Sequence, residues 1–394
     1  MNKMVEVVDG APLADDAPTP KRALPAPDER QTVLVFQGGG ALGAYQAGVY
    51  QALHEAEIEP DWIIGTSIGA INASLIAGNE PEHRLERLQE FWRRMRRKEL
   101  WSRSRWPGAA DTANYWATLL GGIPGFFEPN PLAFFGSHIR LGAENAGFYS
   151  TAPLEKTLSD LVDFSLITRC TPRLTVGAAH VRTSEMRYFD SRTTAITARH
   201  VMASGALPPA FPAVRIDGEL YWDGGILSNT PTEVIFDDDP RRNALIFAVH
   251  MWNPMGGEPQ TIWEVLNRHK DIQYSSRVAS HIARQRQVHK LRHVVSELVK
   301  LIPADKRKQA QELRAYGCLT RMHVVRLLAP RLDNENHTKD IDFTPAGIRS
   351  RWQAGYADTM RALARKAWED DCDPLEGVIL HEPIGNDGPM AERN

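Results

Sequence analysis

The sequence contains few cysteines and no long hydrophobic run. Its three cysteines, Cys170, Cys318 and Cys372, are widely spaced among 394 residues. This spacing suggests neither a disulfide framework nor a CxxC metal site, and it favours a reducing compartment. A run of about eighteen apolar residues, the length that a membrane-spanning helix needs, does not occur. We therefore expect a cytoplasmic protein, for which peripheral contact with a membrane surface stays open.

Excess charge and metal-ligand patterns are also missing. The formal net charge is −3, which gives no overall case for binding nucleic acid. The 13 histidines show no HExxH or paired ligand spacing, and we expect neither a metal nor another cofactor. The run Asp237-Asp238-Asp239-Pro240 is expected to be a solvated loop, since calcium sites need spaced ligands.

Residues 1–30 differ from the rest of the chain. They are rich in Pro, Ala and acidic residues and lack the apolar core of a signal peptide, so we expect them to be disordered. The remainder is long enough for one large domain or two.

Order is expected to begin with a strand, a glycine loop, a helix and a second strand. The apolar run Thr32–Phe36 ends at glycines, helical spacing follows from Tyr45, and Pro60 precedes the apolar residues Trp62–Ile64. Such a unit implies parallel strands joined by a right-handed crossover.

The loop Gly38–Gly43 fits two functions. Its glycines match GxGxxG, but a dinucleotide site would need an acidic residue at the end of the second strand, where the chain reads Gly65-Thr66-Ser67. The favoured alternative is an oxyanion hole, because unpaired N–H groups at a helix N-terminus attract negative charge. Its donors would be Gly38, Gly39 and Gly40.

Ser67 is the candidate nucleophile. Gly65 and Gly69 frame it in a GxSxG pattern, which predicts a tight strand-to-helix turn before an apolar, buried helix over 70–77. A plain helix N-cap serine would explain Ser67 equally well in isolation. The glycine loop on the same unit favours the nucleophile.

Asp223 is the candidate base. Asp217-Gly218 predicts a two-residue hairpin turn, whose second strand carries Asp223 to the pair Gly224-Gly225. The glycines leave room for close backbone approach, although an aspartate here could also cap a turn.

Together these three motifs resemble the patatin-like phospholipase family. Two further blocks are similar to family sequences, Ala203–Pro212 and Gly43–Val49, and the likeness covers roughly residues 31–255. The resemblance implies a three-layer α/β/α fold with a mostly parallel central sheet, and hydrolysis of lipid acyl esters without a cofactor. It assigns a catalytic dyad to Ser67 and Asp223, the oxyanion hole to Gly38, Gly39 and Gly40, and supporting positions to Gly43, Gly65, Gly69, Gly224 and Gly225. Many relatives carry Arg or Lys where this chain has Leu42.

Residues 256–394 are similar to a C-terminal region of unknown function in bacterial members of the family. The stretch Thr261–Lys300 predicts one or two long basic helices, and Met322–Leu328 predicts a strand that joins the main sheet. A further helix is expected from Thr344-Pro345 to about Trp368, and a loose tail after Asp373.

An insertion over residues 91–150 is rich in basic and aromatic residues. Its basic residues through position 106 are opposed only by Glu99, and tryptophans and paired phenylalanines are interspersed. These basic residues are Arg93, Arg94, Arg96, Arg97, Lys98, Arg103 and Arg105. They fit either a solvated helix face before an ordinary packed insertion, or a lid that contacts anionic headgroups.

Other classes remain open. An α/β-hydrolase would use Ser67 and Asp223 with His250, His289 or His323, although its serine turn normally follows several strands. A non-catalytic lipid-binding or membrane-tethering protein would share the fold, and an acyltransferase would share the site while excluding water.

Overall fold

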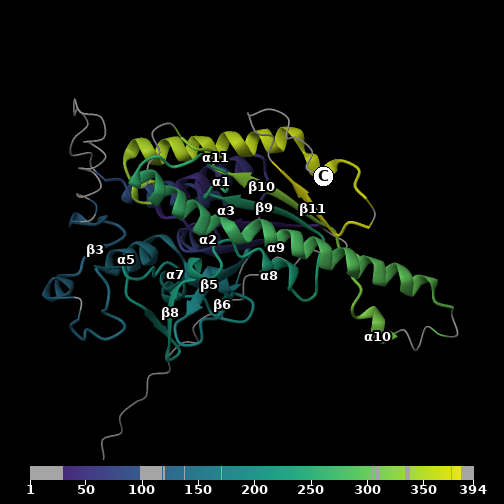
Figure 1. The fold of residues 1–394 in the computed structure, drawn as a ribbon, viewed down its shortest axis with the longest axis horizontal. Helices are drawn as coiled ribbons and strands as arrows, with labels where there is room; N and C mark the ends of the chain where they lie inside the picture. Colours follow the sequence, from purple (N-terminus) through teal and green to yellow (C-terminus); the bar gives the residue numbers. More distant parts are fainter. Residues whose placement is uncertain are drawn as a thin grey trace, which may run out of the picture.

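The structure, a computed structural model, describes residues 30–97, 118, 120–136, 138–169, 171–303, 306, 311–332, 338–373 and 375–382. The segment predicted to be disordered lies outside this range except for Arg30. The same is true of residues 98–117 of the basic aromatic insertion and of residues 383–394. The expectation of a loose tail after Asp373 is wrong for Val378–His381, which form an edge strand of the main sheet. The described residues build one nine-stranded sheet with helices on both faces (Figure 1).

The sheet is mostly parallel. Its strand order is β11-β10-β9-β1-β2-β5-β8-β7, and β6 pairs with β5. All pairs from β11 to β5 are parallel, whereas β6, β7 and β8 form antiparallel pairs at the other edge. The strands are β1 (Gln31–Phe36), β2 (Trp62–Thr66), β5 (Arg173–His180), β6 (Met186–Asp190), β7 (Val214–Ile216), β8 (Glu219–Asp223), β9 (Ala244–His250), β10 (Met322–Leu328) and β11 (Val378–His381).

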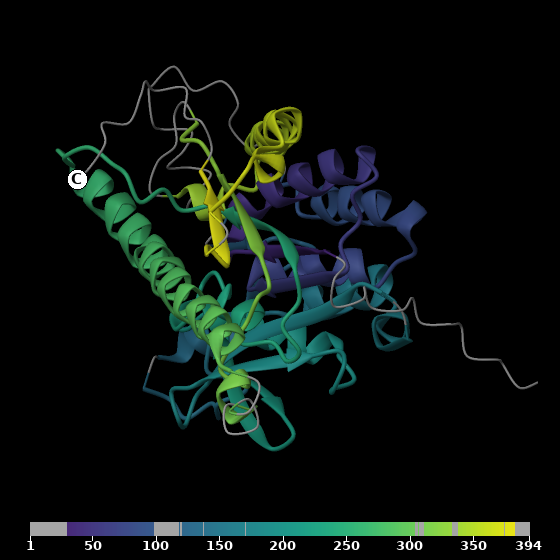
Figure 2. The ribbon, with the colours of Figure 1, turned by 90° about the vertical axis from the view of Figure 1, so that its right-hand side faces the viewer.

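Alternating side chains of the central strands fill two separate cores. Leu34 and Phe36 of β1 belong to one core, and Val33 and Val35 belong to the other. Because strand side chains point alternately to opposite faces, both faces of β1 must be covered. Figure 2 shows the sheet between two helical layers, which confirms the predicted three-layer α/β/α class.

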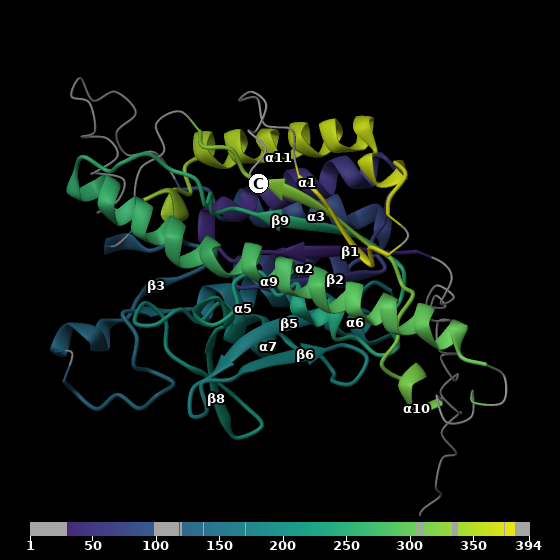
Figure 3. The ribbon, with the colours of Figure 1, turned by 45° about the vertical axis from the view of Figure 1, so that its right-hand side comes forward.

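Two layers of helices provide this cover. The layer over Leu34 and Phe36 contains α1 (Ala44–Glu55), α2 (Ile68–Ala77), α3 (Pro81–Arg94), α5 (Ala152–Leu161), α6 (Phe164–Arg169), α7 (Ala198–Ser204) and α11 (Pro345–Arg365). The opposite layer contains α8 (Glu233–Phe236) and α9 (Ile262–Leu301). Figure 3 shows α9 crossing in front of β1 and β2. The basic stretch predicted as one or two helices is thus a single helix of 40 residues.

Short elements connect these layers. They are η1 (Gly40–Gly43), β3 (Glu128–Pro129), η2 (Pro131–Phe135), β4 (Tyr149–Ser150), η3 (Gly224–Ile226), α10 (Gln311–Arg314), η5 (Lys339–Ile341) and η6 (Ala367–Glu369). In the described part of the chain, no helix is both long and apolar enough to cross a membrane.

The C-terminal region is built into this fold. β10 pairs with β9 along its whole length, and α11 lies against α1 (Figure 1). The two helices touch at glycines: a Cβ on Gly48 would collide with the carbonyl of Trp352, and one on Gly355 with the carbonyl of Tyr45. The Tyr45 hydroxyl also donates to Asp358 Oδ2 at 2.7 Å.

Candidate active site

The sheet register brings Ser67 and Asp223 together. Thr66 at the end of β2 pairs with Gly177 of β5, and the next β5 residue, Ala178, pairs with Asp223 at the end of β8. Ser67 directly follows Thr66, so the hydroxyl and the carboxylate flank the same β5 residues. The glycine loop follows β1, the other neighbour of β2.

Ser67 occupies a strained strand-to-helix turn. Its backbone has φ 57° and ψ −127°, a combination that non-glycine residues rarely adopt and that is typical of nucleophiles on such turns. The turn is so tight that a Cβ on Gly69 would overlap the carbonyl of Phe36, and one on Gly65 the carbonyl of Gly69. Both framing glycines are therefore sterically required.

Ser204 holds the backbone of this turn. Its hydroxyl accepts the N–H of Ser67 at 2.9 Å and donates to the carbonyl of Gly177 at 2.6 Å. Ser204 is completely buried at the end of α7. Ser204 belongs to the block Ala203–Pro212 that is similar to family sequences, but no local pattern marks it, because a serine beside Gly205 is an ordinary helix ending.

Asp223 is an unusually basic carboxylate. Only 3% of the residue is exposed, and this burial raises the pKa of Asp223 to about 7. Hydrogen bonds from the Gly225 N–H, at 2.7 Å, and from the Ser67 hydroxyl oppose the rise. The neighbouring Gly224 lies against the Gly177 carbonyl, where a Cβ would not fit.

The glycine loop offers two free donors. The N–H of Gly38 already donates to the carbonyl of Asn229 at 3.2 Å. Within the described residues, the N–H groups of Gly39 and Gly40 have no acceptor. The predicted set of three oxyanion donors therefore narrows to Gly39 and Gly40. Gly43 ends this turn against Ile68.

Two side chains that the sequence did not single out fix the loop. The carbonyl of Gly38 accepts Asn229 Nδ2 at 3.1 Å and Trp252 Nε1 at 2.8 Å. The N–H of Gly38 also donates to the carbonyl of Asn229, so both the N–H and the carbonyl of Gly38 are hydrogen-bonded. Asn229 and Trp252 lie far from the glycine loop in sequence, so no local pattern could reveal them.

Gln37 ties the same loop to the C-terminal region. Its buried side chain accepts the N–H groups of Met251 and Trp252 and donates to the Thr230 hydroxyl and the carbonyl of Tyr274, on α9. The amide is thus bonded on both sides, and α9 is connected directly to the residue that precedes the glycines.

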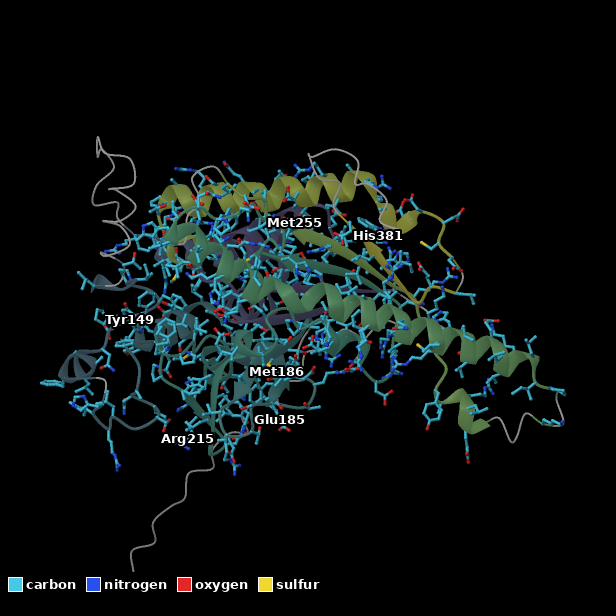
Figure 4. All side chains as sticks on the ribbon, in the orientation of Figure 1. Tyr149, Glu185, Met186, Arg215, Met255 and His381 are labelled. Atoms are coloured by element: carbon cyan, nitrogen blue, oxygen red, sulfur yellow. The ribbon has the colours of Figure 1, made fainter. Side chains whose placement is uncertain are left out.

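A largely apolar cavity of about 190 Å³ opens in front of Ser67 and Asp223. Its apolar walls come from three parts of the chain: the insertion, the segment before β7, and the C-terminal region. The wall residues are Phe126, Phe127 and Tyr149 from the first, Leu207, Ala210 and Phe211 from the second, and Tyr274, Ile341 and Phe343 from the third. Figure 4 labels Tyr149 at the end of the molecule where β3 lies.

Buried charges hold the C-terminal part of this wall. Lys339 Nζ lies 2.6 Å from Asp271 Oδ1 on α9, and both side chains are almost fully buried. Next to them, Lys270 on α9 pairs with Asp340 at 2.7 Å. The carbonyl of Asp340 lies so close to Gly40, which has φ +56°, that a Cβ there would overlap it. These two ion pairs join α9 to η5 and hold η5 against the glycine loop.

None of the three candidate histidines lines this cavity. Burial lowers the pKa of His250 to about 3, and burial beside cationic groups lowers the pKa of His289 to about 4. His323 contacts His381 at 3.0 Å, and Figure 4 shows His381 well away from Tyr149. The geometry therefore gives a serine–carboxylate pair with no histidine from the described residues between them.

The structure describes part of the basic cluster of the insertion and the whole acidic run 237–240. Arg94 of the basic cluster is paired with Glu90 and Asp160, and the guanidinium of Arg97 bonds Thr118. The expectation of a solvated loop at 237–240 is wrong for Asp238, which is buried beside Arg173 and Arg192. The described residues contain no group of three His, Cys, Asp or Glu that could hold a metal ion.

A serine on a strained strand-to-helix turn of an α/β sheet is an arrangement typical of serine hydrolases. Comparison with known families is more specific. Residues 34–236 match the family described as "Patatin-like phospholipase", and residues 272–375 match one described as "Patatin phospholipase". The chain belongs to the patatin-like phospholipase family.

Individual relatives match over half of this chain or less. The "Patatin-like phospholipase domain-containing protein ZK370.4" of Caenorhabditis elegans is 27% identical over 203 residues, which are 51% of this chain and 12% of the relative. "Lysophospholipase nte1" of Aspergillus terreus is 56% identical over 48 residues, 12% of this chain and 3% of the relative. This chain thus matches only a small part of the length of these curated relatives.

Solved structures of low identity are similar as well. VipD from Legionella pneumophila has 18% identity and a TM-score of 0.37, over 86% of this chain and 67% of that one. The type III effector ExoU of Pseudomonas aeruginosa, in complex with SpcU, has 17% identity and a TM-score of 0.26, over 88% and 74%.

Proposed function

We propose that this protein hydrolyses carboxylic ester bonds of lipids through a Ser67–Asp223 dyad and an acyl-enzyme, as a phospholipase, lysophospholipase or carboxylesterase. One observation carries the proposal. The buried carboxylate of Asp223 has a pKa of about 7 and interacts with the hydroxyl of Ser67 at the base of an apolar cavity. A base of this strength is suited to neutral pH.

The first half of the reaction forms the acyl-enzyme. Asp223 accepts the hydroxyl proton as Ser67 Oγ attacks the acyl carbonyl, and the N–H groups of Gly39 and Gly40 stabilise the resulting oxyanion. The tetrahedral intermediate then collapses, and the departing alcohol takes the proton from Asp223. The acyl group remains bound to Ser67.

The second half releases the fatty acid. Asp223 removes a proton from a water molecule, which attacks the acyl carbonyl, and Ser67 leaves with that proton. Leu42 is buried at the position where many relatives carry a cation. Stabilisation of the oxyanion therefore depends on the backbone donors and on the side chains of Asn229 and Trp252 that fix them.

The aromatic walls favour an acyl chain as the ligand of the cavity, and lipid substrates imply peripheral contact with a membrane.

Labelling with a serine-directed fluorophosphonate tests the nucleophile, because only an activated serine reacts. We expect labelling of the wild type and none of Ser67→Ala. A panel of acyl esters of increasing chain length then separates a hydrolase from a lipid-binding protein. Equal labelling of both proteins would overturn the assignment of Ser67, and labelling without ester turnover would favour the binding protein.

A further inference from the structure

A second groove lies between α3 and α11 and is lined in part by Trp92. It has a volume of about 710 Å³. Five arginines line it, Arg87, Arg93, Arg94, Arg96 and Arg349, together with two glutamates, two glutamines and apolar side chains. The groove is thus lined mainly by cationic side chains and in part by tryptophans.

Its two carboxylates already have partners. Glu90 is bonded to both Arg93 and Arg94, which lowers the pKa of Glu90 to about 2. Glu86 pairs with His83. Three arginines are left over, since no described carboxylate lies within ion-pair distance of Arg87, Arg96 or Arg349.

Arg87 provides a second, independent sign of an absent partner. Its Nε is buried and bonds no acceptor in the described part of the chain. A buried guanidinium N–H without an acceptor is costly, and an anion that enters the groove would supply one. Arg96 and Arg349 are exposed and free to turn towards the same ligand.

The groove adjoins the cavity of the active site through one aromatic contact. Trp92 lines the groove, Phe343 lines the cavity, and their stacked rings are 6.3 Å apart. A ligand in the groove would therefore lie directly behind a wall of the catalytic cavity.

We propose that this groove binds a phosphate-bearing ligand, which Arg87, Arg96 and Arg349 contact. Guanidinium groups match phosphate oxygens in geometry and are weakly hydrated, so three unpaired arginines around a concave surface suit this anion. The phosphate belongs either to an anionic lipid headgroup at a membrane surface or to a small soluble phosphate ester. The site is independent of the proposed catalytic roles.

The experiment uses full-length protein carrying Ser67→Ala, so that vesicles stay intact. Binding to phosphatidylcholine vesicles with and without phosphatidylglycerol is measured by sedimentation, and binding of glycerol 3-phosphate by calorimetry. The test variant is Arg87→Gln/Arg96→Gln/Arg349→Gln. The matched control removes three exposed cations elsewhere, Arg169→Gln/Arg284→Gln/Arg314→Gln.

We expect the test variant to bind phosphatidylglycerol vesicles at least about tenfold more weakly, and the control to change less than about twofold. Added salt should weaken wild-type binding. Loss of glycerol 3-phosphate binding with unchanged vesicle binding would identify a soluble ester instead. Equal behaviour of test variant and control in both assays would overturn the proposal. If Arg87→Gln lowers the melting temperature, the pair Arg96→Gln/Arg349→Gln repeats the comparison.

Discussion

Residues 31–255 and the C-terminal residues 256–382 contribute to the active site in different ways. The first part carries Ser67, Asp223 and the glycine loop. The second part supplies no reacting group, yet Tyr274, Ile341 and Phe343 close the cavity and the carbonyl of Asp340 abuts Gly40. The first part therefore supplies the reacting groups and some of the cavity wall, whereas the second part contributes wall alone.

The largest effect is expected from Asp223→Asn. The amide keeps the size of the carboxylate but cannot accept a proton, so ester turnover should fall by a factor on the order of a hundred or more. Steady-state kinetics on a soluble acyl ester measures this change. Circular dichroism serves as the folding control, and a folded variant with near wild-type turnover would exclude Asp223 as the base.

The same substitution should stabilise the protein at neutral pH. The folded-state pKa of Asp223 is raised from 3.8 to about 7, so the folded protein holds a proton that the unfolded chain has lost. The contribution of this group to the unfolding free energy is therefore fully present below about pH 4. It decreases by about 4 kcal/mol as the pH rises from about 4 to about 7. The melting temperature of Asp223→Asn should exceed that of the wild type at pH 8 and approach it at pH 4.

The same pKa predicts the pH dependence of catalysis. Wild-type kcat/KM should rise as the pH increases through about 7, because Asp223 then loses its proton and can act as a base.

Breaking the buried ion pair of Lys339 and Asp271 should disturb the C-terminal part of the cavity wall without affecting the reactivity of Ser67. Lys339→Met leaves the buried Asp271 carboxylate with Arg331, at 3.4 Å, as its one remaining ion-pair partner among the described residues, so we expect a loss of about 3 kcal/mol in unfolding free energy. KM for long-chain esters should rise while the fluorophosphonate still labels Ser67. The control Lys300→Met breaks an exposed pair with Glu297 and should cost less than about 1 kcal/mol in denaturant titration. Equal losses would mean that the buried pair does not hold η5.

A smaller effect is expected from Ser204→Ala, which acts on the position of Ser67. It leaves the N–H of Ser67 and the carbonyl of Gly177 without their shared partner, so kcat should fall roughly tenfold with little change in KM. The rate of fluorophosphonate labelling should fall in parallel. A variant that loses stability but labels at the wild-type rate would make Ser204 purely structural. Ser204→Cys, which keeps the size and a weak donor, should restore part of the rate.

The smallest effects are expected from the histidines. His289→Gln and His323→Gln, measured separately, should keep turnover within about twofold of the wild type, because neither side chain lines the cavity. His250→Gln should do the same as long as it folds, which its melting curve will show. A folded variant as inactive as Ser67→Ala would replace the dyad with a triad.

The features of the structure that could be predicted from the sequence are those that depend on neighbouring residues. The strand, glycine loop, helix and strand at 31–66 and the turn at Asp217-Gly218 depend on nearby residues and lie where expected. Asn229, Trp252, Gln37 and Ser204 could not be identified in this way, because their partners are distant in the chain. Asp238 was misjudged for the same reason, since its arginine partners come from other elements.

The paired glycines of α1 and α11 constrain how this protein can be recombined with its relatives. Gly48 and Gly355 leave no room for a side chain on either helix at their crossing. A chimera joined near residue 255 would pair one of these helices with a helix from another protein. Any side chain at the crossing would then displace α1 and the glycine loop that precedes it. Productive exchanges must therefore transfer α1 and α11 together, as one cassette.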